Sequence, residues 1–215
     1  MPNRHHPFYR YVALGDSLTA GIGSDLFSPD FVDRYAGKAS ALLQKRVIID
    51  KFARSGATSG EILASLDIPV ICETLKASDI VTLTAGGNDL IDAAELFLID
   101  QNEDRLFNAL ESAIITIKKI MERIHDLHHP KHNRYIMRIL NLYNPFPNIP
   151  QAEPWLQKFN SHLNEYARYP HIEVADIYGA FNGKQRELLR GIHPNDQGYE
   201  VMAEVVHRLG YAPLI

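Results

Sequence analysis

The sequence predicts an α/β fold in which helices cover both faces of a mainly parallel, five-stranded sheet. Three observations predict it: short apolar runs bounded by turn residues, segments with helical spacing between them, and a regular alternation of the two along the chain. Such alternation implies right-handed crossovers between parallel strands. In an open parallel sheet, ligands bind at the carboxyl ends of the strands. The residues that follow each strand are therefore the first candidates for a functional site.

The expected strands are the apolar runs, and the expected helices are the segments in which apolar residues recur every three or four positions. Strands are expected at residues 11–14, 47–52, 80–84, 135–142 and 172–175. Helices are expected at residues 31–44, 60–65, 105–127, 154–167 and 196–209. In the third of these helices, apolar residues from Leu106 to Ile124 share one face, which we expect to pack into the core. Asn195 or Asp196 can cap the last helix.

Length and composition predict one globular domain over residues 1–215. The chain is 46% hydrophobic and 22% charged, which is enough apolar material for a packed core. Its formal net charge of −4 leaves no basic excess to neutralise phosphates, so nucleic acid is not expected as a partner. No apolar stretch is long enough to cross a bilayer, and the first residues lack the apolar core of a secretory signal, so a cytoplasmic location is expected. Cys72 is the single cysteine, and we expect it to be buried.

Two short motifs near opposite ends of the chain offer a nucleophile and a base. Gly15-Asp16-Ser17-Leu18 follows the first predicted strand, and His193 lies just before the last predicted helix. A serine hydroxyl is a weak nucleophile until an imidazole takes its proton. The pattern therefore indicates Ser17 as nucleophile and His193 as its base. The alternative is a turn followed by a helix N-cap, since Gly, Asp and Ser are all favoured there.

Polar motifs that contain glycine also follow the second and third predicted strands, at residues 54–58 and 86–89. Acyl transfer through a serine creates a tetrahedral oxyanion, which needs preorganised hydrogen-bond donors. The backbone N–H of Gly56, the side-chain amide of Asn88 and the backbone N–H of Ser17 are candidate donors. We expect all three motifs to face one crevice.

The remaining polar side chains are expected to be structural. Asp16 and Asp89 stand beside the candidate reactive groups, where carboxylates usually accept hydrogen bonds from nearby backbone N–H groups. A histidine cluster ends one helix, where histidine favours the helix dipole, and a proline interrupts its spacing, so no metal site is expected there. Its members are His125, His128, His129 and His132. No organic cofactor is expected, because neither a GxGxxG turn nor a GxxxxGK[ST] loop is present.

Taken in order, these motifs resemble the blocks of the GDSL, or SGNH, family of esterases and lipases. The blocks are Gly15-Asp16-Ser17-Leu18, Gly56, Gly86-Gly87-Asn88-Asp89 and His193-Pro194-Asn195, and they span nearly the whole chain. The resemblance implies a flavodoxin-like three-layer α/β/α sandwich. It also implies Ser17 as nucleophile and His193 as base, with Gly56 and Asn88 in the oxyanion hole. Residues 11–14 and 193–204 look similar to bacterial spore-germination lipases, which implies a spore-associated location.

One position departs from the family pattern. The family usually has an aspartate three residues before the histidine, where this chain has Arg190. A cation does not accept the imidazole N–H, so another acceptor has to hold His193 in its productive tautomer. A main-chain carbonyl near Arg190 and the carboxylates of Asp176 and Glu187 are the alternatives. We expect a working dyad of Ser17 and His193.

Two connecting segments indicate the substrate class. Residues 21–31 and 141–155 are apolar for loops, and a hydrophobic wall beside the crevice would favour an acyl chain. The predicted function is a carboxylic ester hydrolase of the lipase or phospholipase kind, acting on a small-molecule or lipid ester. Three alternatives stay open: a carbohydrate esterase that removes small acyl groups, a noncatalytic flavodoxin-like binding module, and a germination or cell-surface interaction protein with a degenerate site.

Overall fold

Five parallel strands form the central sheet of the computed structural model, which describes residues 7–128, 134–166 and 171–215. The strands are β1 (Phe8–Gly15), β2 (Arg46–Ala53), β3 (Ile80–Thr84), β4 (Ile136–Leu140) and β5 (Ile172–Ala175). They lie in the order β2-β1-β3-β4-β5, and each neighbouring pair is parallel. This is the flavodoxin-like order, whose topological switch point lies between β1 and β3. The predicted fold class is confirmed.

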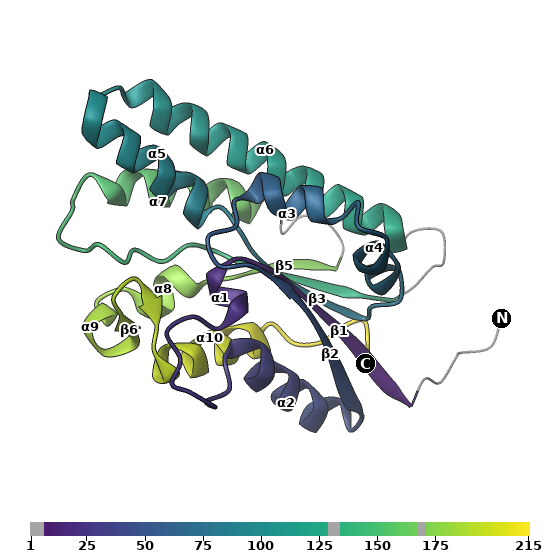
Figure 1. Cartoon of the computed structure of the whole chain (residues 1–215). Coiled ribbons are helices and arrows are strands. Elements are labelled where there is room, and N and C mark those ends of the chain that lie inside the picture. The colour runs from purple at the N-terminus through teal and green to yellow at the C-terminus, as the bar shows by residue number, and fades with distance from the viewer. Residues whose placement is uncertain (1–6, 129–133, 167–170) are drawn as a thin grey trace.

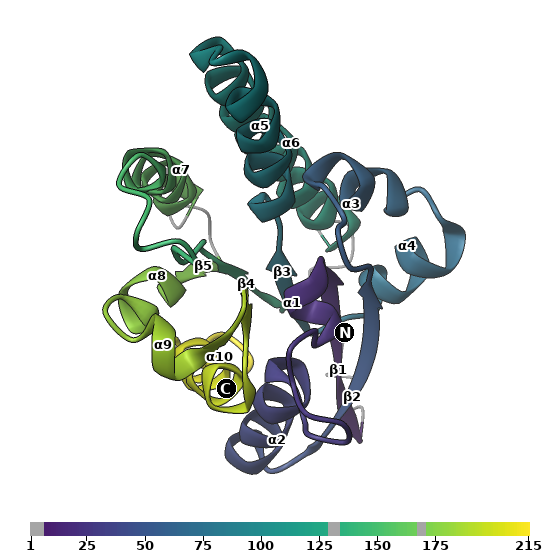
Figure 2. The same ribbon diagram turned by 60° about the vertical axis from the view of Figure 1, so that its left-hand side comes forward.

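Helices cover both faces of the sheet (Figure 1, Figure 2). One layer contains α3 (Ser59–Ser65), α4 (Pro69–Lys76), α5 (Gly87–Asp100), α6 (Glu103–His128) and α7 (Ala152–Glu165). The other contains α1 (Ser17–Ala20), α2 (Phe31–Leu43), α8 (Ile177–Phe181), α9 (Gln185–Leu188) and α10 (Asp196–Arg208). Along β1, Val12 and Leu14 pack against the first layer, and Tyr11 and Ala13 pack against the second. Because both faces are buried, the strands appear in the sequence as continuous apolar runs.

The predicted elements match the structure where the sequence pattern is strong. Each predicted strand is present, and the apolar face of α6 from Leu106 to Ile124 is buried. Helices α1, α4, α5, α8 and α9 were not predicted. Only Ala93 is buried in α5, so no apolar stripe marks this helix, which packs along α6 and extends beyond the sheet (Figure 2). The expectation for Cys72 was wrong: it lies on α4 and is only half-buried, with one side against the core.

A second, very small sheet was also not predicted. It consists of β6 (Leu189–Arg190) and β7 (His193–Pro194), which pair antiparallel, with Arg190 opposite His193. Two residues are too few to give a periodic pattern in the sequence. Among the helices that the structure describes, none combines the length and the apolar character that a membrane span requires.

The register of the three adjacent strands β2, β1 and β3 sets the position of the candidate site. Gly15, the last residue of β1, pairs with Ala53 at the end of β2 and with Thr84 at the end of β3. The segments that carry Ser17, Gly56 and Asn88 therefore leave the sheet at the same level. Since β1 lies between its two neighbours, the Ser17 segment is flanked by the other two.

Candidate active site

The structure brings Ser17 and His193 together, although they are 176 positions apart in the sequence. His193 Nε2 lies 3.0 Å from Ser17 Oγ, which is hydrogen-bond distance. Ser17 is the first residue of α1, directly after β1, and His193 lies on β7, just before α10. The serine is 8% exposed, so its hydroxyl is partly sheltered from water.

Asp16 fixes the turn that presents Ser17. Its Oδ1 accepts hydrogen bonds from the backbone N–H of Leu18 at 3.0 Å and from the Thr84 hydroxyl at 2.8 Å. The backbone N–H of Asp16 also contacts Thr84 Oγ1, at 3.2 Å. Burial raises the pKa of Asp16, and the donors from Thr84 and Leu18 oppose that shift. Asp16 thus ties the end of β1 to the end of β3 and points its carboxylate at structural partners.

Bonds to the backbone on both sides hold the segment that carries His193. The hydroxyl of Tyr143 donates to the carbonyl of Ile192 at 2.7 Å, and Asn195 caps α10 by accepting from the N–H of Gly198 at 2.9 Å. The sequence had indicated Tyr143 as part of an apolar wall. Instead its side chain is buried, and its phenol fixes the residue that precedes His193.

Burial lowers the pKa of His193 below its ordinary value of 6.5. The neutral imidazole therefore predominates at neutral pH, which is the state that can accept a proton from a serine. For Nε2 to accept that proton, Nδ1 must carry the ring hydrogen. In the described part of the chain, the side chain of His193 makes no hydrogen bond other than the contact with Ser17.

The side chain of Arg190 and the two candidate carboxylates, those of Asp176 and Glu187, have other partners. Arg190 forms an exposed ion pair with Asp25, at 2.8 Å. Asp176 Oδ1 accepts from Asn141 Nδ2 and from the N–H of Gly179, both at 2.9 Å, and so caps α8. Glu187 Oε1 accepts from Gln197 Nε2 at 2.6 Å. Among the described residues, neither carboxylate hydrogen-bonds to His193.

Gly56 and Asn88 lie on the two segments that flank Ser17. Gly56 has a φ of +78°, which glycine adopts without strain, and no atom lies within 4 Å of the position that a Cβ would take. Asn88 Nδ2 donates one hydrogen to the carbonyl of Ala57 at 2.8 Å, which leaves its second amide hydrogen for another acceptor. Asp89 accepts from both the N–H and the hydroxyl of Ser59, at 2.9 and 2.6 Å. These bonds connect the segment that carries Gly56 to the segment that carries Asn88.

The described histidines of the predicted cluster have packing roles. His128 is buried, and its Nδ1 lies 2.8 Å from the carbonyl of Ile124, while its ring stacks on Tyr135. His125 Nδ1 lies 3.1 Å from the hydroxyl of Tyr135. His129 and His132 lie outside the described residues.

This chain belongs to the GDSL-like lipase/acylhydrolase family, whose model matches residues 13–201. The protein is therefore a serine esterase or lipase of the GDSL type, which favours the hydrolase interpretation over a noncatalytic binding module. It is 40% identical over 207 residues to the spore germination lipase LipC of Bacillus licheniformis, an alignment that covers 95% of this chain and 98% of the relative.

Solved structures of related proteins share the fold. The lipase Lip_vut3 from a goat rumen metagenome superposes with a TM-score of 0.93 at 40% identity, over 96% of this chain and 100% of the other. The acetylxylan esterase Axe2 from Geobacillus stearothermophilus has a TM-score of 0.70 at 15% identity, over 93% of each chain. The second likeness concerns the fold alone.

The lowered pKa of His193 leads to a prediction about pH. With His193 as the base, kcat/KM follows its deprotonation, because only the neutral imidazole accepts the serine proton. Since burial lowers the pKa below 6.5, we expect activity to persist at mildly acidic pH, where an exposed histidine is mostly protonated. A pH profile of kcat/KM on a soluble ester measures this pKa, and tryptophan fluorescence checks that the protein stays folded. An acidic limb centred above 6.5 would contradict the prediction.

Proposed function

We propose that the protein hydrolyses carboxylic esters through an acyl-enzyme on Ser17, with His193 as base. The donors of the oxyanion hole are the backbone N–H groups of Ser17 and Gly56 and the side-chain amide of Asn88. One observation carries the proposal: Nε2 of His193 lies 3.0 Å from Oγ of Ser17, at the carboxyl edge of the sheet between the Gly56 and Asn88 segments.

The proposed reaction has two halves that use the same groups. His193 Nε2 removes the proton from Ser17 as Oγ attacks the ester carbonyl carbon, and the oxyanion that forms is stabilised by the three donors. When this intermediate collapses, the imidazolium gives its proton to the leaving alkoxide. A water molecule, deprotonated by His193, then attacks the acyl carbon, and Ser17 regains its proton as the carboxylate product leaves.

We propose that Ser17 and His193 work as a dyad without a carboxylate third member. Arg190 replaces the usual aspartate and pairs with Asp25. Asp176 and Glu187 are engaged by Asn141 and Gln197, respectively. Serine hydrolases that lose one member of a triad retain measurable catalysis from the oxyanion hole and substrate binding.

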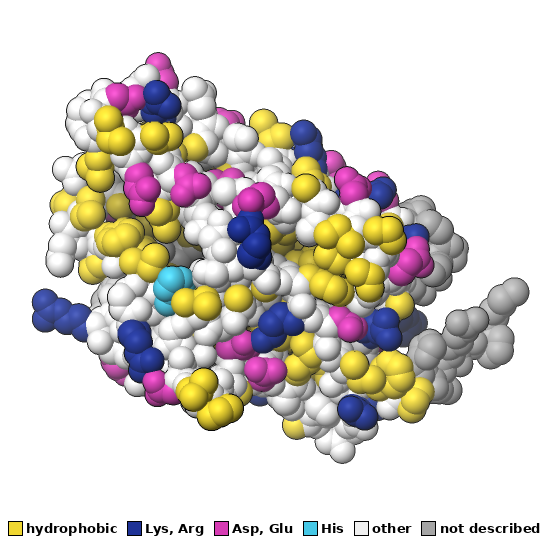
Figure 3. All heavy atoms as spheres, viewed as in Figure 1, with side chains coloured by type: hydrophobic (Ala, Val, Ile, Leu, Met, Phe, Trp, Pro, Cys, Tyr) yellow, Lys and Arg dark blue, Asp and Glu magenta, His cyan; other side chains and the backbone are white. Residues whose placement is uncertain are grey.

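The proposed substrate is a lipid or another ester with a medium or long acyl chain. Apolar side chains are exposed on the two segments that the sequence indicated as a wall (Figure 3). They are Ile22, Leu26 and Phe27 on the first segment, and Phe146 and Ile149 on the second. The relatives at 40% identity are named lipases, and one of them is named for spore germination, so a spore-associated role is part of the proposal.

The alternative is a carbohydrate esterase that removes acetyl groups. It is compatible with the shared fold of Axe2, an acetylxylan esterase that is 15% identical to this chain. The same catalytic parts would serve either substrate, so the length of acyl chain that the protein accepts decides between them.

Fluorophosphonate labelling tests the nucleophile and the base. We expect one phosphonyl group per chain, mapped by mass spectrometry to Ser17, no labelling of Ser17→Ala, and a labelling rate at least about a hundredfold lower in His193→Ala. Ser161→Ala is the matched control, because the exposed hydroxyl of Ser161 on α7 donates to the carbonyl of Lys158 at 2.8 Å, and it should label at the normal rate. A label on another residue, or equal rates with and without His193, would contradict the assignment.

Conservative variants of the two carboxylates test the dyad. Asp176→Asn keeps an oxygen for the donors of Asn141 and Gly179, and Glu187→Gln keeps one for Gln197, so both should fold. We expect each kcat to stay within about threefold of the unaltered value, since neither group supports the imidazole. A loss of a hundredfold or more in either variant would identify that carboxylate as a third member.

Chain-length profiling tests the substrate class. The exposed apolar side chains of the two segments predict that kcat/KM on p-nitrophenyl esters rises from acetyl to octanoyl, by about tenfold or more. Activity on acetylated xylan oligosaccharides serves as the comparison. Strict preference for acetate, together with release of acetate from the oligosaccharides, would reverse the choice in favour of the carbohydrate esterase.

A further inference from the structure

The imidazole of His193 is held close to Ser17 without a carboxylate behind it, so other contacts must set its position. One segment touches both partners. Residues 21–28 leave α1, pass beside β7 and α10, and lead to the start of α2. The contacts of this 21–28 segment are the basis of the inference, which rests on the proposed function.

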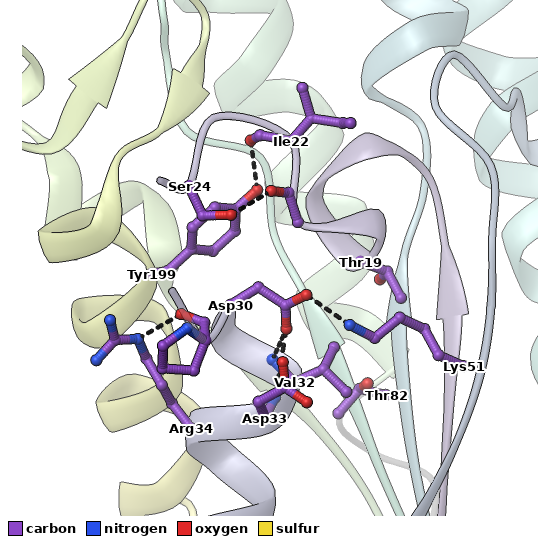
Figure 4. A network of polar contacts seen from close by, with 12 residues as sticks. Thr19, Ile22, Ser24, Asp30, Val32, Asp33, Arg34, Lys51, Thr82 and Tyr199 are labelled. Atoms are coloured by element: carbon purple, nitrogen blue, oxygen red, sulfur yellow. Dashed lines mark hydrogen bonds and ion pairs between the residues drawn. The ribbon is translucent and has the colours of Figure 1, made fainter. Parts of the chain in front are cut away.

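The backbone of one residue, Ile22, links the turn of the nucleophile to the helix that follows the base. The N–H of Ile22 donates to the carbonyl of Ser17 at 3.0 Å, and the carbonyl of Ile22 accepts from the hydroxyl of Tyr199 at 2.6 Å. Figure 4 shows this phenol pointing at the Ile22 carbonyl. Tyr199 is completely buried in α10, which begins three residues after His193. Loss of the hydroxyl would leave the Ile22 carbonyl without this donor.

The next residue, Gly23, lies directly against His193. Its φ is +101°, and a Cβ built on it would lie 2.5 Å from the carbonyl oxygen of Pro194 and 2.9 Å from Cβ of His193. Both distances are far below van der Waals contact, and one involves backbone, which cannot swing aside. Any side chain at this position would therefore push the His193 segment away from the nucleophile.

Both ends of the 21–28 segment are fixed. Just beyond its carboxyl end, the buried carboxylate of Asp30 caps α2 and pairs with Lys51 of β2 at 2.5 Å (Figure 4). Gly21 packs against that carboxylate. In the middle, Asp196 of α10 accepts from the N–H of Asp25 at 3.0 Å and from the hydroxyl of Ser28 at 3.1 Å.

We propose that the 21–28 segment positions His193 against Ser17, with Tyr199 and Gly23 as positioning residues. Neither touches the reacting atoms. The segment connects the Ser17 turn to the backbone around His193 and so holds the imidazole at a fixed position relative to Ser17 Oγ. In other serine hydrolases, the carboxylate of the triad orients the imidazole. The segment places no negative charge beside the imidazolium, so it affects the position of His193 and not the stability of its charged form.

The variant Tyr199→Phe removes one hydroxyl and nothing else. We expect kcat on a soluble p-nitrophenyl ester to fall on the order of tenfold with KM within about twofold, because the reacting groups lose alignment while the residues that would contact the ester substrate are unchanged. The rate of fluorophosphonate labelling should fall in parallel, while the final amount of label per chain stays at one. The matched control is Tyr166→Phe, which removes a phenol that donates to the carbonyl of Ile114 at 3.0 Å, at the end of α7 away from the site. Its kcat should not change.

A second variant, Gly23→Ala, tests the contact with His193 independently. We expect a loss of kcat of about a hundredfold, since the added methyl displaces the base. Gly210→Ala is its control, because Gly210 also has a positive φ, +76°, but no atom within 4 Å of its Cβ position. Alanine there also has to adopt a positive φ, but it meets no collision, and the variant should keep its kcat.

Thermal unfolding and the final amount of label separate positioning from misfolding. A variant that only destabilises the protein labels fewer chains at an unchanged rate, whereas a positioning variant labels every chain slowly. Unchanged kcat and labelling rates in both Tyr199→Phe and Gly23→Ala, or equal losses in their controls, would overturn the proposal and leave the hydrolase assignment intact. Failure of the unaltered protein to label at Ser17 would instead overturn the proposed function itself.

Discussion

The contact between Ser17 and His193 depends on the register of three adjacent strands. Gly15 stands level with Ala53 and Thr84, so the segments after β1, β2 and β3 leave the sheet together. The buried hydrogen bonds between Asp16 and Thr84 then lock the Ser17 turn to the neighbouring strand. Bonds of this kind are strong because water does not compete for them. A shift of one strand by a single residue would reverse its buried and exposed side chains and separate these segments.

The second requirement is that the segment carrying His193, near the end of the chain, lies against the Ser17 turn, and two tyrosines bond to the backbone there. The hydroxyl of Tyr143 donates to the carbonyl of Ile192, next to His193. The hydroxyl of Tyr199 donates to the carbonyl of Ile22, whose N–H bonds to the Ser17 turn. Burial raises the pKa of both phenols well above the ordinary value, so both remain neutral donors. Arg190 is left free to pair with Asp25 at the surface. These bonds fix the backbone on both sides of the contact between Ser17 and His193, and burial lowers the pKa of the imidazole.

The sequence was sufficient for the features that depend on local pattern. The strands and the buried face of α6 followed from apolar periodicity, and the placement of Ser17, Gly56 and Asn88 at one edge followed from parallel topology. The positioning contacts were not predictable, because each depends on tertiary structure. Nothing in the sequence around Tyr199 distinguishes a phenol that bonds to Ile22, which is 177 positions away, from an ordinary core tyrosine. Helix α5 was not predicted because its only buried residue, Ala93, gives no apolar periodicity in the sequence.

A crystal structure of the protein phosphonylated by a fluorophosphonate tests the central claim most directly, because the adduct imitates the tetrahedral intermediate. The account predicts phosphorus on Ser17 Oγ and the phosphonyl oxygen within hydrogen-bond distance of the N–H groups of Ser17 and Gly56 and of the Asn88 amide. His193 Nε2 should face the position of the leaving group. A phosphonyl oxygen directed away from these donors, or an imidazole turned out to solvent, would contradict the account.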